Sequence, residues 1–326
     1  MNSNPLLYAL RRLAQAIPLV LVIATVNFLL LQLAPGNAAD VLAGEAGAAT
    51  PEYMEQLRKT FGLDQPLGIQ LLIYIKQILS LDLGFSFRHN MPVIDLIGSR
   101  LGPTLLLMGS VLVISVGVGS LLGAYAARNL NRWQDNMISM LAVLAYATPV
   151  FWAGLMLIVL FAIKLGWFPS SGMQQIAAFH EGFAKVRDIA HHLVLPAVTL
   201  TMFYLALYTR LMRASVLEQF SMDYVVTARA KGLTERQIAT RHVLRNALLP
   251  VLTMAGIQVG GLLGGAVVVE TVFAWPGLGM LAYESLFARD LNLLLGIFFV
   301  CTCLVVVVNL VVDIVYSLLD PRIDLR

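Results

Sequence analysis

The sequence predicts an all-α polytopic membrane protein, and composition and hydropathy indicate this independently of any motif. Apolar residues make up 59% of the 326 residues and charged residues only 13%, with a mean hydropathy of +0.80. A soluble domain averages about 25% charged residues. Only helices or closed barrels satisfy the backbone in lipid, and barrel strands would alternate over about 10 residues, so the long apolar runs are expected to be helices.

Six apolar runs are long enough for a bilayer crossing, which takes about 20 mostly apolar residues. The expected spans are Leu13–Leu33, Thr104–Ala126, Met137–Ile163, Leu195–Val216, Ala247–Phe273 and Leu293–Leu318. The first run is longer than the apolar core of a signal peptide, about 7–15 residues, so it is expected to be retained. The chain then divides into an N-terminal helix (1–34), an outer region (35–103) and a core of five spans (104–326).

The distribution of Lys and Arg predicts the orientation, because cytoplasmic loops carry an excess of both. With the N-terminus inside, the short inner segments hold most of the cations, and both termini are expected to be cytoplasmic. The outer segments mix their cations with more acids. The formal net charge of +3 is then a topology signal, and nucleic-acid binding has little support.

Inside the long outer region, two helical segments are expected. Thr50–Phe61 carries a capping Thr50 followed by Pro51 at the first helical position. After a turn at Gly62–Pro66, Ile69–Leu81 is amphipathic. The region is either a small folded cap or a contact surface for another protein.

A polar, basic, helix-prone segment, Asp223–Pro250, separates the fourth and fifth expected spans. Asp223 lies where a helix N-cap would, Thr227–Lys231 is typical of helix, and Gly232 suits a C-cap. A second short helix is expected over Thr234–Arg245, capped through Thr234 and the residue three positions on. With its approach, the segment carries seven cations, at Arg210, Arg213, Arg229, Lys231, Arg236, Arg241 and Arg245. A helix, a glycine turn and a helix on a membrane surface indicate a docking element for a cytosolic partner.

The pattern Ala228-Arg229-Ala230, Gly232 and Leu249-Pro250 resembles the cytoplasmic loop of ABC-importer permeases. The sequence around this loop is similar to that of the peptide (dipeptide/oligopeptide/nickel) branch of that family. The motifs that carry this second resemblance are Leu63-Asp64-Gln65-Pro66, Asp82-Leu83-Gly84, Arg100-x-x-Pro103-Thr104-Leu105 and Phe273–Gly279. They fall in order over essentially the whole chain.

The resemblance implies a permease subunit in the bacterial inner membrane that moves di- or oligopeptides inward. It also implies a second homologous permease subunit, two ATPase subunits that bind ATP and Mg, and an extracytoplasmic solute-binding protein. The chain itself would be no enzyme and would hold no cofactor or metal. Nickel chelates, glutathione and opines stay open as substrates. The implied ATPase-coupling loop is Asp223, Tyr224, Ala228, Arg229, Ala230, Gly232, Leu233, Glu235, Arg236, Leu249 and Pro250.

Four polar residues within the spans are candidates for the substrate path: Gln258, Glu270, Asn309 and Asp313. An intramembrane carboxylate is costly unless it faces a cavity or a partner. Glu270 would either bind a substrate amino group or pair with a neighbouring Arg or backbone donor. Asn309 and Asp313 lie one turn apart near the inner end of the last span, where anchoring of neighbouring helices is the favoured role.

Glycine spacing and aromatic placement give two structural expectations. Gly119 and Gly123, Gly256, Gly260 and Gly264, and Gly261 and Gly265 recur four residues apart, which indicates close helix packing. In the third outer segment, Pro276 and Gly277 must break the helix. Trp275 lies where an interfacial aromatic anchor would, and structural anchoring is favoured for this segment over a gate.

Missing motifs narrow the class of protein. There is no G-x-x-x-x-G-K-[ST], so any ATPase must be a separate chain, and neither H-E-x-x-H nor G-x-S-x-G occurs. The adjacent His191 and His192 would point apart on a helix, and Cys301 and Cys303 are expected to be packing residues. A secondary transporter should show inverted repeats, which are not evident, and an intramembrane enzyme lacks a recognisable catalytic set.

Overall fold

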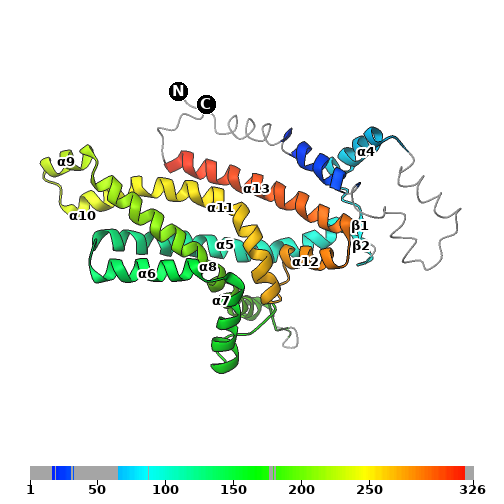
Figure 1. Ribbon diagram of the computed structural model, residues 1–326, viewed down its shortest axis with the longest axis horizontal. Helices are drawn as coiled ribbons and strands as arrows, with labels where there is room; N and C mark the ends of the chain where they lie inside the picture. The colour runs from blue at the N-terminus through cyan, green and yellow to red at the C-terminus, as the bar shows by residue number, and fades with distance from the viewer. Residues whose placement is uncertain are drawn as a thin grey trace. The chain divides into compact units, whose positions relative to one another are not determined.

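The computed structural model describes residues 17–18, 20–30, 32, 65–86, 88–175, 179 and 181–319, the last eight by their backbone alone. These residues form long helices and one short hairpin (Figure 1). They fall into two compact units, one from the residues up to Ser99 with Ala282–Val306, the other from Arg100–Leu281 with the residues after Val306.

The helices follow the expected order along the chain. Their bounds are α4 Leu67–Leu79, α5 Val93–Arg128, α6 Trp133–Ala147, α7 Val150–Leu157, α8 Gly182–Phe220, α9 Asp223–Ala230, α10 Glu235–Ile238, α11 Leu244–Val272, α12 Leu278–Phe287 and α13 Leu291–Leu319. Two π-helical segments continue α7 and α10, η1 at Ile158–Lys164 and η3 at Ala239–Val243. Strands β1 (Phe85–Ser86) and β2 (Met91–Pro92) pair antiparallel.

Four described helices are long and apolar enough to cross a membrane: Val93–Arg128, Gly182–Phe220, Glu235–Val272 and Leu291–Val311. A bent pair, α6 with α7 and η1, would be a fifth span. The first expected span lies only partly within the described residues, where Val20–Leu30 is helical. The described chain is therefore mostly helical, with four or five candidate membrane spans whose boundaries differ from the expected ones.

The clearest difference lies in Met137–Ile163, expected as one straight span. The structure breaks it after Ala147, and the helix axis bends by 103° between the two parts. Thr148 is extended (φ −80°, ψ 126°), and Pro149 follows it. A proline disfavours helical geometry at the residue before it and supplies no N–H to continue the helix, which accounts for the break.

Two other boundaries also move. The short helix expected over Thr234–Arg245 is not separate, because α10, η3 and α11 run on continuously to Val272. Helix α5 begins at Val93, so the expected boundary between outer region and core at residue 103 falls inside a helix. Pro103 lies within its interior.

In the first unit, α4 packs on the beginning of α13. Ile78 and Phe299 are buried together with Ala24, and the Asn27 side-chain amide donates to the Leu295 carbonyl at 3.3 Å. Helix α4 matches the amphipathic segment expected at Ile69–Leu81. The helix expected at Thr50–Phe61 lies outside the described residues.

The second unit is built around α8 and α11, which cross along much of their length, with α5, α6 and α7 against them. In Figure 1, α9 and α10 lie at one end of this bundle, and α7 turns away near the other. Gly123 confirms the expected close packing, since a Cβ there would lie 2.8 Å from Met212 Cβ on α8. Gly260 and Gly264, by contrast, have no neighbour within 4 Å of an added Cβ.

Candidate functional site

The basic segment between α8 and α11 folds as predicted in outline, with one shift in position. Helix α9 begins at Asp223 itself, and Met222 (φ −77°, ψ 146°) is the N-cap. The N-cap expected at Asp223 is therefore wrong by one residue, and the helix starts four residues before Thr227. Asp223 lies in the first turn, where a carboxylate interacts favourably with the helix dipole.

Gly232 ends α9 in the left-handed conformation that its position predicted, with φ +80°. The Gly232 N–H donates to the Arg229 carbonyl at 2.9 Å, and the Leu233 N–H donates to the Ala228 carbonyl at 3.3 Å. These two bonds are those of a Schellman motif. An added Cβ at Gly232 would meet nothing within 4 Å, so the constraint on this residue within the chain is conformational.

The predicted capping box at the start of α10 is confirmed. The Thr234 N–H donates to Gln237 Oε1 at 3.0 Å, and the Gln237 N–H donates to Thr234 Oγ1 at 3.4 Å. An ion pair also joins the two helices, because Arg229 donates to both Glu235 carboxylate oxygens at 2.7 and 3.2 Å. Both side chains are exposed, at 49% and 66%, so solvent screens this pair and it adds little stability.

The two alanines of the loop have opposite surroundings. Ala228 is 7% exposed and packs with Val225 in the core of this chain, whereas Ala230 is exposed. Outward from the bundle, α9 presents Met222, Val226 and Ala230, which are four residues apart and therefore on one face. Val226 is 63% exposed. The free apolar face of α9 is this triplet, and it excludes Ala228.

The remaining coupling-loop candidates divide between the loop and the long helix. Tyr224 is half-buried and its hydroxyl donates to Gln219 Oε1 at 2.9 Å, and Leu233 packs on the core. Arg236 is exposed. Leu249 and Pro250 lie inside α11, with Pro250 about 18 Å along the helix from Ile238, so they do not share the surface of α9.

Glu270, a substrate-path candidate, is fully buried near the end of α11, and its carboxylate is hydrogen-bonded to groups of this chain. Its carboxylate accepts from Thr104 Oγ1 at 2.7 Å and from the N–H groups of Gly279 and Met280 at 2.7 and 3.0 Å. The two N–H groups belong to the first turn of α12, where a carboxylate is favoured. This arrangement ties α12 and α5 to α11, and leaves Glu270 with no exposed surface.

The turn from α11 to α12 closes over the same carboxylate. A Cβ at Gly277 would overlap the Glu270 carboxyl group. Trp275 is fully buried and its Nε1–H donates to the Pro103 carbonyl at 3.0 Å, so it is a structural anchor, but not one exposed as an interfacial aromatic would be. The tryptophan instead fastens the turn to α5.

The other substrate-path candidates lie on two helices. Gln258 is half-buried on α11, Asn309 is exposed on α13, and Asp313 lies where only the backbone of α13 is described. Their place in a translocation path stays a prediction.

The described residues contain no group of three or more potential metal ligands. The two adjacent histidines bond within the chain: His191 Nε2 lies 2.8 Å from the Trp167 carbonyl, and His192 Nδ1 lies 2.9 Å from the Asp188 carbonyl. Their rings are nearly perpendicular, at 86°, as expected of neighbours on a helix. Cys301 and Cys303 are half-buried on α13, and no disulfide joins them.

Comparison with protein families gives matches to two models. Residues 119–325 match the binding-protein-dependent transport system inner membrane component, and residues 6–108 match the N-terminal region of the same kind of membrane component. Together with the apolar helices, these matches define a membrane-embedded subunit of a transport system. The chain belongs to the family of inner-membrane components of binding-protein-dependent transport systems.

Individual relatives cover almost the whole chain. A permease protein of Brucella ovis is 40% identical over 317 residues, 97% of this chain and 98% of that protein. The dipeptide transport system permease protein DppB of Alkalihalophilus pseudofirmus is 35% identical over 98% of this chain and 99% of its own length. The glutathione transport system permease protein GsiC of Escherichia coli is 38% identical over 97% and 98%.

Among solved structures, the fold is similar to that of a chain of the MetNI methionine ABC transporter in an inward-facing conformation. The TM-score is 0.55, and the match covers 70% of this chain and 97% of that chain. At 17% identity the likeness concerns the fold alone.

Proposed function

We propose that this chain is the transmembrane permease subunit of an ATP-binding-cassette importer that moves di- or oligopeptides into the cell. The observation that carries the proposal is the α9–α10 loop, which is held rigid by its own hydrogen bonds and ion pair and exposes an apolar face. A loop that only connected two spans would gain nothing from a Schellman motif, a capping box and an Arg229–Glu235 pair between Ala228 and Gln237. Such rigidity suits a surface that transmits force from a partner.

The partners follow from the same proposal. Two ATPase subunits would hold ATP and Mg, and one of them would dock on α9. A second homologous permease would complete the membrane domain, and a solute-binding protein would deliver substrate from outside. The chain itself would be a transport subunit in the bacterial inner membrane with both termini cytoplasmic. An ion-coupled secondary transporter is the alternative of a different class.

Peptides are proposed as substrates because relatives are named for peptide and dipeptide transport. Glutathione is itself a small peptide, and one relative is named for its transport. Nickel chelates and opines stay as alternatives for the same machinery. The solute-binding protein that co-purifies, with its bound ligand identified by mass spectrometry, distinguishes among these substrates.

Retention of ATPase subunits by purified complexes tests the docking surface. We expect Val226→Glu and Ala230→Glu to be inserted at normal levels but to lose most of the ATPase, because a charge would be forced into an apolar contact. Asn136→Glu is the control, since Asn136 is exposed at the start of α6 on the same end of the bundle. A tagged wild-type chain that retains no ATPase would contradict the importer, and normal retention by both α9 variants would contradict the assigned surface.

A further inference from the structure

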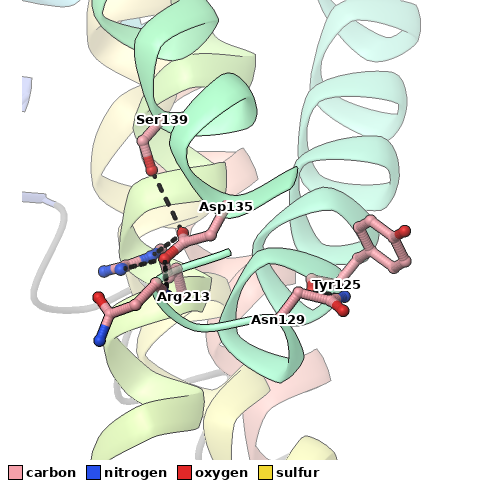
Figure 2. A network of polar contacts seen from close by, with 6 residues as sticks. Tyr125, Asn129, Asp135, Ser139 and Arg213 are labelled. Carbon is pink, nitrogen blue, oxygen red and sulfur yellow. Dashed lines mark hydrogen bonds and ion pairs between the residues drawn. The ribbon is translucent and has the colours of Figure 1, made fainter. Parts of the chain in front are cut away.

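A partly buried ion pair joins α6 to α8 (Figure 2). Arg213 Nε donates to Asp135 Oδ1 at 2.6 Å, and Arg213 Nη2 donates to Asp135 Oδ2 at 2.8 Å. Asp135 is 2% exposed and Arg213 is 30% exposed. A bidentate pair of this kind fixes the relative orientation of its two groups as well as their separation.

The same carboxylate also holds the turn between α5 and α6. The Asn131 N–H donates to Asp135 Oδ2 at 3.1 Å, and Asn131 adopts a positive φ of 60°. Ser139 Oγ lies 3.5 Å from Asp135 Oδ1, one turn further along α6. Asp135 therefore connects three parts of the chain: the α5–α6 turn, the first turn of α6, and α8.

On another side of α8, glycines bring α5 into backbone contact at the same level. A Cβ at Gly119 would lie 2.9 Å from Tyr208 Cβ, and one at Gly123 would lie 2.9 Å from the Arg213 backbone nitrogen and would overlap the Thr209 carbonyl oxygen. Helix α8 is thus held by α5 through close packing and by α6 through the ion pair, both around Arg213.

This level is close to the proposed ATPase contact. Arg213 lies seven residues before α8 ends at Phe220, which is about 10 Å along the helix, and α9 begins three residues later. Val216 of α8 shares one core with Val225 and Ala228 of α9. A displacement of α9 is therefore passed first to the part of α8 that Asp135 and Gly123 hold.

We infer that the Asp135–Arg213 pair and the close packing at Gly123 form a rigid joint. Through this joint, motion of α9 is transmitted to α5 and α6. The inference rests on the proposed importer function. Because sliding or rotation of α8 would break the bidentate geometry, the inner ends of α5, α6 and α8 move as one body. Asp135 is then a positioning residue for coupling, which acts through Arg213 and touches no substrate.

The test uses the full complex, with ATPase and partner permease subunits, reconstituted in vesicles. Spin labels at the exposed positions Asn136 on α6 and Arg210 on α8 report their distance without nucleotide and with ATP and vanadate. We expect this distance to stay constant in the wild-type background and to change on trapping in Asp135→Asn. ATP hydrolysis is measured beside uptake of radiolabelled dialanine, and the dialanine carried per ATP should fall about fivefold in Asp135→Asn.

Two further variants make the outcome decisive. Arg213→Lys keeps the charge but cannot donate two parallel bonds, so it should also lose coupling, and Glu218→Gln on the exposed surface of α8 should not. The inference is overturned if the wild-type distance changes as much as that of Asp135→Asn. It is also overturned if Asp135→Asn couples ATP hydrolysis to dialanine uptake normally. It is overturned too if neither pair variant assembles, since the pair would then serve folding alone. Wild-type complexes without ATPase would instead contradict the proposed function, and a wild-type complex inert towards dialanine would contradict only the substrate class.

Discussion

Glu270 shows how a buried carboxylate is stabilised with no cation at hydrogen-bond distance among the described residues. Its three hydrogen bonds come from Thr104 and two N–H groups at the start of α12. Each donor would itself be unsatisfied without the carboxylate, and an unpaired buried polar group costs about 1–3 kcal/mol. The residue therefore stabilises the turn after α11.

Replacing Glu270 by Gln should destabilise the protein by about 1–3 kcal/mol, because the amide offers one acceptor oxygen where the carboxylate uses two. Thermal unfolding of the purified protein in detergent measures this as a lower midpoint. Gly277→Ala should lower it as well, since the new methyl overlaps the carboxyl group. An unchanged midpoint, with loss of uptake alone, would favour a substrate contact for Glu270.

Gly232 is the second residue at which a single substitution is informative. Its left-handed conformation costs a residue with a Cβ about 1–2 kcal/mol, although an added Cβ would meet no atom of the described residues within 4 Å. Gly232→Val should leave the protein inserted and weaken ATPase retention or coupling, as measured by co-purification and uptake. Gly232→Asn is the matched control, because Asn tolerates this conformation best after Gly. Normal uptake by the Val variant at normal expression would remove the turn from the mechanism.

At the scale of the element, α9 is two-sided, with a core face at Val225 and Ala228 and an exposed face at Met222, Val226 and Ala230. The two alanines that sequence places side by side therefore report on different contacts. Enlarging one changes the packing of this chain, and enlarging the other changes only what docks on it.

Ala228→Phe should lower the unfolding midpoint of the isolated subunit, because overpacking a core costs about 1–3 kcal/mol. Ala230→Phe should leave that midpoint unchanged and reduce ATPase retention. Unfolding in detergent and co-purification, measured on both variants, separate folding from docking. If Ala230→Phe retained the ATPase and transported normally, α9 would have no role in coupling.

At the scale of the whole molecule, the proposed orientation places α9 and the start of α6 inside the cell. Single cysteines at Gln134 and Glu235 should then resist an impermeant thiol reagent in intact cells, and one at Lys185 should be labelled, in a background free of Cys301 and Cys303. All three should react once the membrane is permeabilised. Labelling of position 235 from outside would invert the topology and remove the docking proposal.

Sequence alone was enough to predict the helical membrane class, the order of the spans and the local signals at Gly232 and Thr234. Apolar length and cap chemistry depend on neighbours along the chain, so they can be read without a fold. The break at Thr148–Pro149 also had a local cause, but the long apolar run around it masked the signal.

The contacts of buried polar groups and small residues, by contrast, became visible only in the fold. Glu270 lies 166 residues from Thr104, and Arg213 lies 78 residues from Asp135, so no spacing in the sequence links them. The burial of Ala228 and of Trp275 was equally out of reach, because burial depends on which helix packs across each face. Local chemistry fixed the elements, whereas long-range packing assigned the roles of their side chains.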